Sequence, residues 1–341
     1  MVTIEDVAKL AGVSTMTVSR VVNKSESVKP TTREKVLKVI EETGYKPNMN
    51  AMSLVSGKSK MIGILSSNYY NQAYLDIVVA IEEYAYGEGF TVINANVNDY
   101  VTACNALDLF LGKQVEGIIV LPLEMKMTKV EDYRDSLKEL AKFSEYFKQT
   151  VKRHNVPVIT VSQKFEGIEN VAFDFEGVAK LAMDKLFEKG YRDIAMLNST
   201  IDDGFWIQKE RIYREAMIAN GCEKHILIEK DIALVDGGRD AMLRVLEKRT
   251  PKAVFCANDY MAIGALQVIN AKKLSVPDDI AVIGNDNVVF CEMTSPRLTT
   301  VSLNMKTAGE TAVKRLFERL GGSEQKADSI TGIEYIERET V

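Results

Sequence analysis

A short stretch near the N-terminus combines side chains suited to contact nucleic acid. Hydroxyl and guanidinium groups bind phosphate oxygens, whereas Thr and Met side chains can also touch base edges or a thymine methyl group. The apolar residues Val18, Val21 and Val22 recur at helical spacing, so the polar residues between them are predicted to face outward. The candidate DNA-contacting residues of this stretch are Ser14, Thr15, Met16, Thr17, Ser19, Arg20 and Asn23.

Two further helices are predicted to hold this stretch in place. Thr3 can cap a helix whose apolar residues lie on one face, and Gly12 ends it before the cap at Ser14. A Thr31-x-x-Glu34 pattern predicts the start of a third helix, which ends at Gly44. Three short helices with a tight turn between the first two indicate a helix-turn-helix, which places its second helix in the DNA major groove. A plain three-helix packing unit is the alternative.

The distribution of charge supports a nucleic-acid partner. The whole chain has a formal net charge of −5, yet residues 1–60 contain ten Lys or Arg against six Asp or Glu. That region therefore carries +4 and the remaining 281 residues carry −9. A basic N-terminal region on an acidic body suits a protein that presents one end to phosphates.

Length and composition indicate a soluble protein of two or three folding units. The chain has 341 residues, of which 46% are hydrophobic and 27% charged. No apolar run is long enough to span a bilayer, and no basic stretch followed by an apolar one marks a signal peptide. We therefore expect a cytoplasmic protein without a membrane partner.

No pattern in the sequence indicates an enzyme, a metal site or a cofactor. The four cysteines are far apart, and neither His154 nor His225 lies beside a plausible nucleophile or ligand cluster. Nucleophile elbows, phosphate-binding loops and dinucleotide-binding glycine patterns are absent. The carboxylate pairs at 202–203 and 278–279 are adjacent residues, which is more typical of turns than of an acid/base pair.

From residue 62 onward, β-branched runs alternate with amphipathic helical stretches, which is the pattern of parallel α/β sheets. There are too many units for one small sheet, so two similar subdomains with a cleft between them are expected, with ligands at the carboxyl ends of the strands. The predicted strands are Ile62–Leu65, Thr91–Ala95, Gly117–Leu121, Pro157–Ser162, Asp193–Leu197, Lys252–Cys256 and Ile280–Gly284. The predicted helices are Leu75–Tyr86, Val178–Lys189, Lys209–Asn220, Asp240–Lys248 and Met261–Lys272.

The sequence resembles the lactose/galactose-repressor (LacI/GalR) family of bacterial transcription regulators. In the N-terminal region the resemblance is carried by residues 2–23 (VTIEDVAKLAGVSTMTVSRVVN), 32–36 (TREKV) and 44–48 (GYKPN). In the core it is carried by residues 112–119 (GKQVEGII), 257–265 (ANDYMAIGA), 276–280 (VPDDI) and 295–301 (SPRLTTV). The resemblance covers nearly the whole chain, and it implies that Thr15 and Met16 choose the operator bases.

The resemblance also implies a hinge helix in the linker after the N-terminal domain. Residues 50–54 align with a family segment that folds on DNA, in which Ala51 and Leu54 contact the minor groove and the leucine wedges between base steps. Met52 stands where the family usually has Arg. A plain flexible connector is the alternative.

For the core, the resemblance implies a small-molecule effector, held between the subdomains and typically a sugar. Asn258 and Asp286 match polar residues that hold sugar hydroxyls, and the single tryptophan can supply an aromatic face. Lys209 replaces a usual Arg, Ile212 a common Gly and Asn285 a usual aromatic residue. A phosphorylated or acidic sugar, another metabolite or no small molecule stay open. The candidate effector-binding residues are Asn71, Tyr74, Trp206, Lys209, Asn258 and Asp286.

One branch of the family offers an alternative partner. The catabolite-control branch responds to a phosphorylated carrier protein as corepressor, and it also carries Lys at the position of Lys209 and an Asp-aromatic-Glu triplet like Asp174-Phe175-Glu176. In that case the core is a protein-docking surface. Residues 124–153 form a connection longer than is usual in the family and predict an extra amphipathic helix.

The predicted fold is an all-α helix-turn-helix domain (1–46), a hinge or linker (47–60) and an α/β core (61–341) of two Rossmann-like subdomains, as in type I periplasmic binding proteins. The first subdomain is expected at about 61–161 and 290–323, and the second at about 162–289 and 324–341. The expected assembly is a homodimer on a near-palindromic operator.

Overall fold

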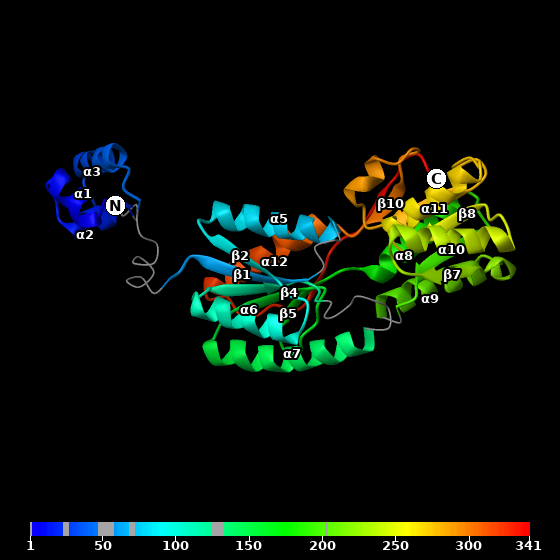
Figure 1. Cartoon of the computed structure of the whole chain (residues 1–341), viewed down its shortest axis with the longest axis horizontal. Helices are drawn as coiled ribbons and strands as arrows, with labels where there is room; N and C mark the ends of the chain where they lie inside the picture. Colours follow the sequence, from blue (N-terminus) through cyan, green and yellow to red (C-terminus); the bar gives the residue numbers. More distant parts are fainter. Residues whose placement is uncertain (1, 23–26, 47–57, 68–71, 124–132, 202–203) are drawn as a thin grey trace. The chain divides into compact units, whose positions relative to one another are not determined.

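The computed structural model of the chain divides into two compact units, residues 1–60 and 61–341 (Figure 1). It describes residues 2–22, 27–46, 58–67, 72–123, 133–201 and 204–341. Four of the predicted site residues, Asn23, Ala51, Leu54 and Asn71, lie outside these ranges, as does most of the predicted hinge. Within the described ranges, no helix is long and apolar enough to cross a bilayer.

The N-terminal unit contains three helices, α1 (Ile4–Ala11), α2 (Thr15–Val22) and α3 (Pro30–Thr43), as expected. Thr3 and Asp6 cap α1 reciprocally, each side chain bonding the other residue's backbone N–H. Gly12 ends α1 in the left-handed conformation, with φ of 62°, which glycine adopts without strain. This turn allows α1 and α2 to pack on a small valine and alanine core, Val7, Ala8, Ala11, Val18, Val21, Val28 and Val36.

The predicted start of α3 was wrong. The helix begins at Pro30, with Lys29 at the cap position and no side-chain cap, so Thr31 lies inside the first turn. Proline fixes φ at a helical value and has no N–H to satisfy, which makes it a good first helical residue. The proline therefore determines where α3 begins, and the capping-box pattern at Thr31 does not.

The first sheet of the core is parallel and has the order β11-β5-β4-β3-β1-β2. Its strands are β1 (Met61–Ser66), β2 (Thr91–Asn96), β3 (Gly117–Val120), β4 (Val158–Val161), β5 (Glu169–Ala172) and β11 (Ser329–Ile330). Its helices are α5 (Gln72–Gly87), α6 (Tyr100–Gly112), α7 (Tyr133–His154) and α12 (Met305–Leu320). Helices α5 and α12 pack together on one face, and α6 and α7 pack on the other (Figure 1).

The second sheet has the order β12-β10-β9-β8-β6-β7, parallel except for β12. Its strands are β6 (Ile194–Ser199), β7 (Ile228–Asp231), β8 (Ala253–Cys256), β9 (Ala281–Asn285), β10 (Thr299–Ser302) and β12 (Glu334–Ile336). The helices are α8 (Phe175–Glu188), α9 (Gly204–Ala219), α10 (Val235–Lys248) and α11 (Asp259–Ala271), with α8 on α9 and α10 on α11. Two short 3-10 helices, η2 (Glu223–His225) and η3 (Val289–Glu292), complete this part.

The expected subdomain boundaries need correction. Strand β5 pairs with β4 and β11 in the first sheet, whereas β10 pairs with β9 in the second. The chain therefore crosses between the sheets after Ala172, after Ser302 and after Ile330. The sequence did not reveal β5 because Glu169 and Asn170, although buried, are polar and do not form an apolar run.

Helix α7 confirms that the long connection contains an amphipathic helix. Its buried residues include Phe143, Phe147 and Val151, which pack on the same cluster as Phe110 of α6. Its last turn carries Lys152 and Arg153, cations that interact favourably with the negative end of the helix dipole. In the part of α7 whose side chains are described, the apolar face thus packs on its own subdomain.

Candidate functional site

The local sequence of α2 fixes which side chains face outward. The Ser14 hydroxyl accepts a hydrogen bond of 3.2 Å from the backbone N–H of Thr17 and so caps the helix. Val18 and Val21 are buried against α1 and α3. The opposite face is therefore left open along the first two turns.

All of the predicted DNA-contacting residues that the structure describes are accessible. Thr15 and Arg20 are exposed, Met16 is 63% exposed, and Thr17 and Ser19 are half-buried. The exposed thioether chain of Met16 is available for apolar contacts such as those with a thymine methyl group. Its place in the first turn of α2 is where a recognition helix meets base edges.

A polar hollow beside α2 adds residues that the sequence analysis missed. Ser14, Thr17 and Arg20 line it together with residues from the connection and the start of α3. The added polar residues are Ser27, Lys29 and Thr32. Two hydroxyls and an ammonium next to the Arg20 guanidinium suit a phosphate backbone. In the sequence, these residues could have been recognised as polar or basic side chains that follow the second helix.

The second candidate site lies at the carboxyl edge of the second sheet, where Lys209 is buried. Residues Trp206, Lys209, Tyr213 and Met217 form the buried stripe of α9, so the lysine occupies a position that is otherwise apolar. Its ammonium donates a 2.7 Å hydrogen bond to the carbonyl oxygen of Ala257 and a second one to Asn285 Oδ1. Those two acceptors directly follow β8 and end β9, which is the edge where such sheets bind ligands.

Aromatic rings surround the same ammonium. The Lys209 Nζ lies 5.8 Å from the ring centroid of Phe175, 5.6 Å from that of Phe205 and 5.3 Å from that of Trp206. The Phe175 and Phe205 rings stack 4.8 Å apart. Because ring faces attract cations, this arrangement partly replaces the hydration that the ammonium loses. Phe175 and Phe205, both half-buried, were not among the predicted effector residues.

Burial shifts the titration of the two charged groups at this edge. Desolvation lowers the pKa of Lys209 to about 8, although Asp286 and Asp259 oppose the shift. Desolvation raises the pKa of the Asp286 carboxyl to about 7, and Lys209 partly offsets that shift. Asp286 is half-buried and has φ of 114°, a value rare for a residue with a side chain.

The other predicted effector residues have structural partners. Asn258 caps α11, because its side-chain oxygen accepts from Met261 N, while its amide donates to the carbonyl of Ala233. Trp206 is only 8% exposed and packs on Phe205. Tyr74 is half-buried against the main core cluster. Their roles in effector binding stay predictions.

Asn198 is a polar residue at this edge that the sequence did not single out. It lies in β6 and is almost fully buried, with its amide donating to the Trp206 carbonyl oxygen at 3.2 Å. Its side-chain oxygen has no hydrogen-bond partner in the described part of the chain. A buried acceptor without a hydrogen-bond donor is costly, so a hydrogen-bond donor would bind favourably at this oxygen.

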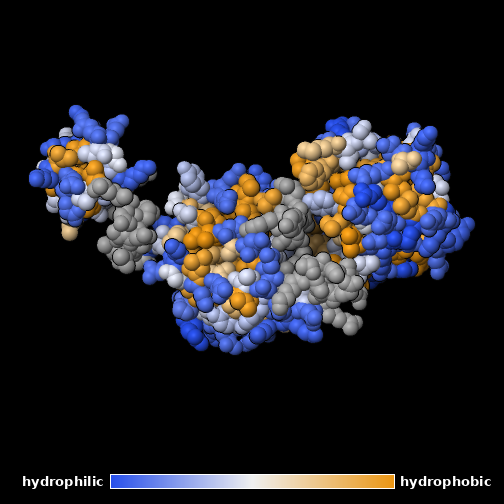
Figure 2. Space-filling model, in the orientation of Figure 1, coloured by the Kyte–Doolittle hydropathy of each residue, from blue (hydrophilic) through white to orange (hydrophobic). Residues whose placement is uncertain are grey.

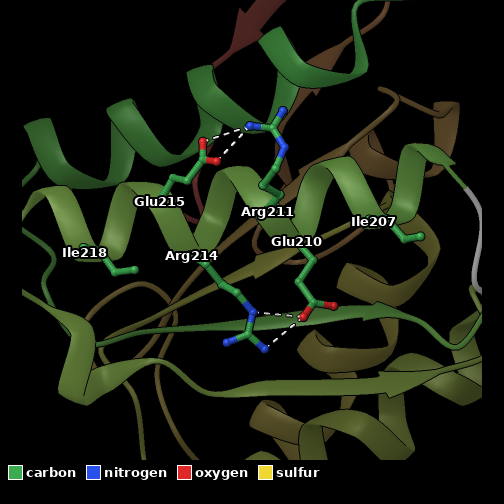
Figure 3. A pocket seen from close by; sticks show the side chains of 6 residues that line it. All are labelled: Ile207, Glu210, Arg211, Arg214, Glu215 and Ile218. Atoms are coloured by element: carbon green, nitrogen blue, oxygen red, sulfur yellow. Dashed lines mark hydrogen bonds and ion pairs between the residues drawn. The ribbon is translucent and has the colours of Figure 1, made fainter.

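A shallow apolar hollow on the outer face of α9 lies away from this edge (Figure 3). Ile207 and Ile218 line it, and two ion pairs within the helix, Arg211 with Glu215 and Arg214 with Glu210, bound it. These side chains point away from the stripe that contains Lys209. The hollow is therefore separate from the candidate effector site.

Comparisons with known proteins find matches for both parts of the chain. Residues 3–48 match the family of bacterial regulatory proteins, lacI family, and residues 183–341 match a periplasmic binding protein-like domain. The chain is 32% identical to the HTH-type transcriptional repressor PurR of Vibrio campbellii, over 96% of this chain and 94% of that protein. It is also 32% identical to catabolite control protein A of Priestia megaterium, over 92% and 91% of the two chains.

A solved structure matches over almost the entire chain. The lac repressor dimer bound to operator and the anti-inducer ONPF superposes with a TM-score of 0.80 at 28% identity, covering 99% of this chain and 98% of that one. The match includes the helix-turn-helix domain and both α/β subdomains. The chain therefore belongs to the LacI family of bacterial regulatory proteins and is a DNA-binding transcription regulator, not an enzyme.

Proposed function

We propose that this chain is a homodimeric repressor that reads a near-palindromic operator through Thr15 and Met16 and responds to a neutral, hydroxyl-rich effector such as a carbohydrate. The observation that carries the first part is the exposed Met16 in the first turn of α2, above a helix face of buried valines. Ser14, Thr17, Ser19 and Arg20 then position the helix on phosphates. Asn23, Ala51 and Leu54 extend the DNA contacts into the linker.

Exposed apolar surface on the core supports a dimer. Helices α5 and α6 expose Val79, Tyr86 and Val101, and the segment at η3 exposes Phe290 and Met293. Figure 2 shows apolar surface on both subdomains of the core. Contiguous exposed apolar surface is typical of protein–protein interfaces. A two-fold dimer presents two recognition helices about one turn of DNA apart, which explains the predicted near-palindrome.

The chemistry around Lys209 favours a neutral effector over a phosphorylated one. The ammonium already donates to Ala257 and Asn285, so it is engaged inside the protein and is not presented as an anion clamp. Nearby, the Asp286 carboxyl and the unpaired Asn198 oxygen are acceptors that suit hydroxyl donors. The half-buried rings of Phe175 and Phe205 supply the apolar face that carbohydrate rings prefer. Asn71, Tyr74, Trp206 and Asn258 complete the proposed site.

Two experiments test this function separately. Selection from a random duplex pool with the full chain is expected to recover a near-palindrome, and a pool without a preferred sequence would contradict the operator part. Thermal unfolding is then followed with ribose, glucose, cellobiose, glucose 6-phosphate, gluconate and hypoxanthine. A true effector at 100 times its dissociation constant stabilises by about 2.7 kcal/mol. Stabilisation by a neutral sugar that Asp286→Asn abolishes supports the site, whereas stabilisation by the phosphate or the base alone contradicts it.

A regulator controlled by a phosphorylated carrier protein is the second candidate. The similarity to catabolite control protein A and the Asp174-Phe175-Glu176 triplet favour it. A core that no compound stabilises, but that retains a phosphorylated carrier protein in a pull-down, would establish this candidate and exclude the carbohydrate.

A further inference from the structure

Asp259, the first residue of α11, is a fully buried carboxylate whose described hydrogen-bond donors are all neutral. Its Oδ1 accepts a 2.6 Å hydrogen bond from the Thr300 hydroxyl, and its Oδ2 accepts a 2.9 Å bond from the backbone N–H of Val288. Burial raises the pKa of this carboxyl, and the nearby backbone N–H of Asn287 and the Cys291 thiol act in the opposite direction. A buried carboxyl is costly unless donors satisfy it, and the donors from Thr300 and Val288 come from two other segments of the chain.

Gly284 leaves the space that the carboxylate occupies. A Cβ atom at this position of β9 would lie 2.1 Å from Asp259 Oδ1, a distance that no side chain tolerates. The glycine has no unusual φ, so the close approach explains its presence and conformational freedom does not. The strand and the carboxylate are therefore fitted to each other.

The segment that Asp259 holds has a strained backbone. Asp286 has φ of 114° and Asn287 has φ of 58°, both on the side of the conformational map that favours glycine. Such conformations persist only where surrounding contacts enforce them. Here the enforcing contacts are the bond from Val288 N to Asp259, a 3.0 Å bond from Asp286 N to Val301 O and a 2.8 Å bond from Arg338 to the Asn287 side chain.

The contacts of Asp259 also include the strand after which the chain leaves the second sheet. Thr300 and Val301 belong to β10, and the chain crosses to α12 of the first sheet just after β10 ends. Val301 O also accepts a hydrogen bond from the Asn285 amide, whose oxygen accepts from Lys209. Asp259 is thus bonded both to the segment that carries Asp286 and to the strand that leads to the other subdomain.

We infer that Asp259 is a positioning residue: it does not touch the effector but fixes residues 286–288 on β10, so that Asp286 is held at the effector site in its strained conformation. The effect on effector binding rests on the proposed role of Asp286. The effect on the backbone does not, because it is a property of the protein without effector.

Amide hydrogen exchange of the full chain without effector tests this inference at two backbone positions. Asp259→Ala removes the carboxylate that accepts from Val288 and lies near Asn287, so the amides of these two residues are expected to exchange at least about tenfold faster, a change of about 1.4 kcal/mol in protection. Asp259→Asn keeps a carbonyl oxygen for these amides and can donate to the Thr300 hydroxyl. It is expected to restore exchange to within about threefold of the unaltered chain.

Thr300→Val is the matched control, because it removes one bond of the same carboxylate but no bond of the 286–288 segment. It is expected to leave the two amides within about threefold of the unaltered chain. Equal exchange in Asp259→Ala and Thr300→Val would overturn the inference.

If Asp259→Ala does not fold, Gly284→Ala supplies the test, because its methyl group displaces the carboxylate. Unchanged exchange at Asn287 and Val288 in that variant would also overturn the inference. Failure of every compound to bind would instead count against the proposed function alone.

Discussion

The two candidate sites use polar residues in opposite ways. In the N-terminal domain the functional side chains are accessible on and beside one short helix whose valines are buried, and all of them lie within a short stretch of the sequence. In the core, Lys209 and Asp259 are buried, and the groups around them come from α9, β8, β9 and β10. A surface that reads DNA needs accessible donors, whereas a site that encloses a small molecule must exclude water and satisfy its own polar groups.

The largest expected effect is on the folding of the N-terminal domain alone. Val18→Asp places a charge in the small valine core and is expected to destabilise that domain by at least about 3 kcal/mol, which abolishes operator binding. Limited proteolysis and operator affinity measure the two effects. Leu37→Asp is the control, because Leu37 is 48% exposed on α3. Loss of binding with an intact N-terminal domain would show that Val18 is not buried.

The core is expected to respond strongly to loss of its buried cation. Lys209→Met leaves Asn285 Oδ1 and the Ala257 carbonyl without their donor, which is expected to lower the free energy of unfolding by about 2 to 4 kcal/mol. Urea unfolding measures this change. Lys230→Met is the control on the same subdomain: this lysine is paired with Glu210 at the surface and should cost less than about 1 kcal/mol. Equal losses would contradict the structural role of Lys209.

A smaller effect is expected at the phosphate-facing side of α2. Arg20→Ala is expected to weaken binding to all DNA sequences similarly and to reduce the slope of log affinity against log salt by about 1. Titrations from low to moderate salt with operator and unrelated DNA measure the slope. A loss confined to the operator would instead assign Arg20 to base recognition.

The smallest expected effect is on the pH dependence of core stability. Because burial raises the pKa of Asp286 to about 7, the folded chain holds the proton more tightly than the unfolded chain does. Stability relative to Asp286→Asn should therefore fall as the pH rises from about 4 to about 7 and stay low above it. Unfolding of both chains at pH 5 and pH 8 tests the sign. An equal difference between the two chains at pH 5 and pH 8 would contradict the raised pKa of Asp286.

The difference between the two sites also explains which of their features could be predicted from the sequence. Helical spacing of Val18 and Val21 after the cap at Ser14 determines which residues face outward, so the accessible face of α2 followed from the sequence and was confirmed. The β-α alternation likewise predicted two sheets, but β5 was missed because its buried Glu169 is neutralised by Arg315, more than a hundred positions away.

The core site was harder to predict because its contacts are long-range. Lys209 and Asn285 are 76 positions apart, and only the fold brings them together. A lysine within the apolar stripe of α9 was the one available signal of its burial. Phe175 was noted only as part of a triplet shared with the catabolite-control branch, and Phe205 carried no signal of a ring beside Lys209. The role of Asp259 depends on Thr300, Val288 and Gly284, which only the fold places around it.

The most direct test of the account is to select preferred DNA sequences with the unaltered chain and with the Thr15→Ala, Met16→Ala double variant. The unaltered chain should recover a near-palindrome, and the variant should lose preference at the same positions of both half-sites, each lost base contact being worth about 1 to 3 kcal/mol. An unchanged motif in a folded variant would contradict the claim that these two residues read the operator.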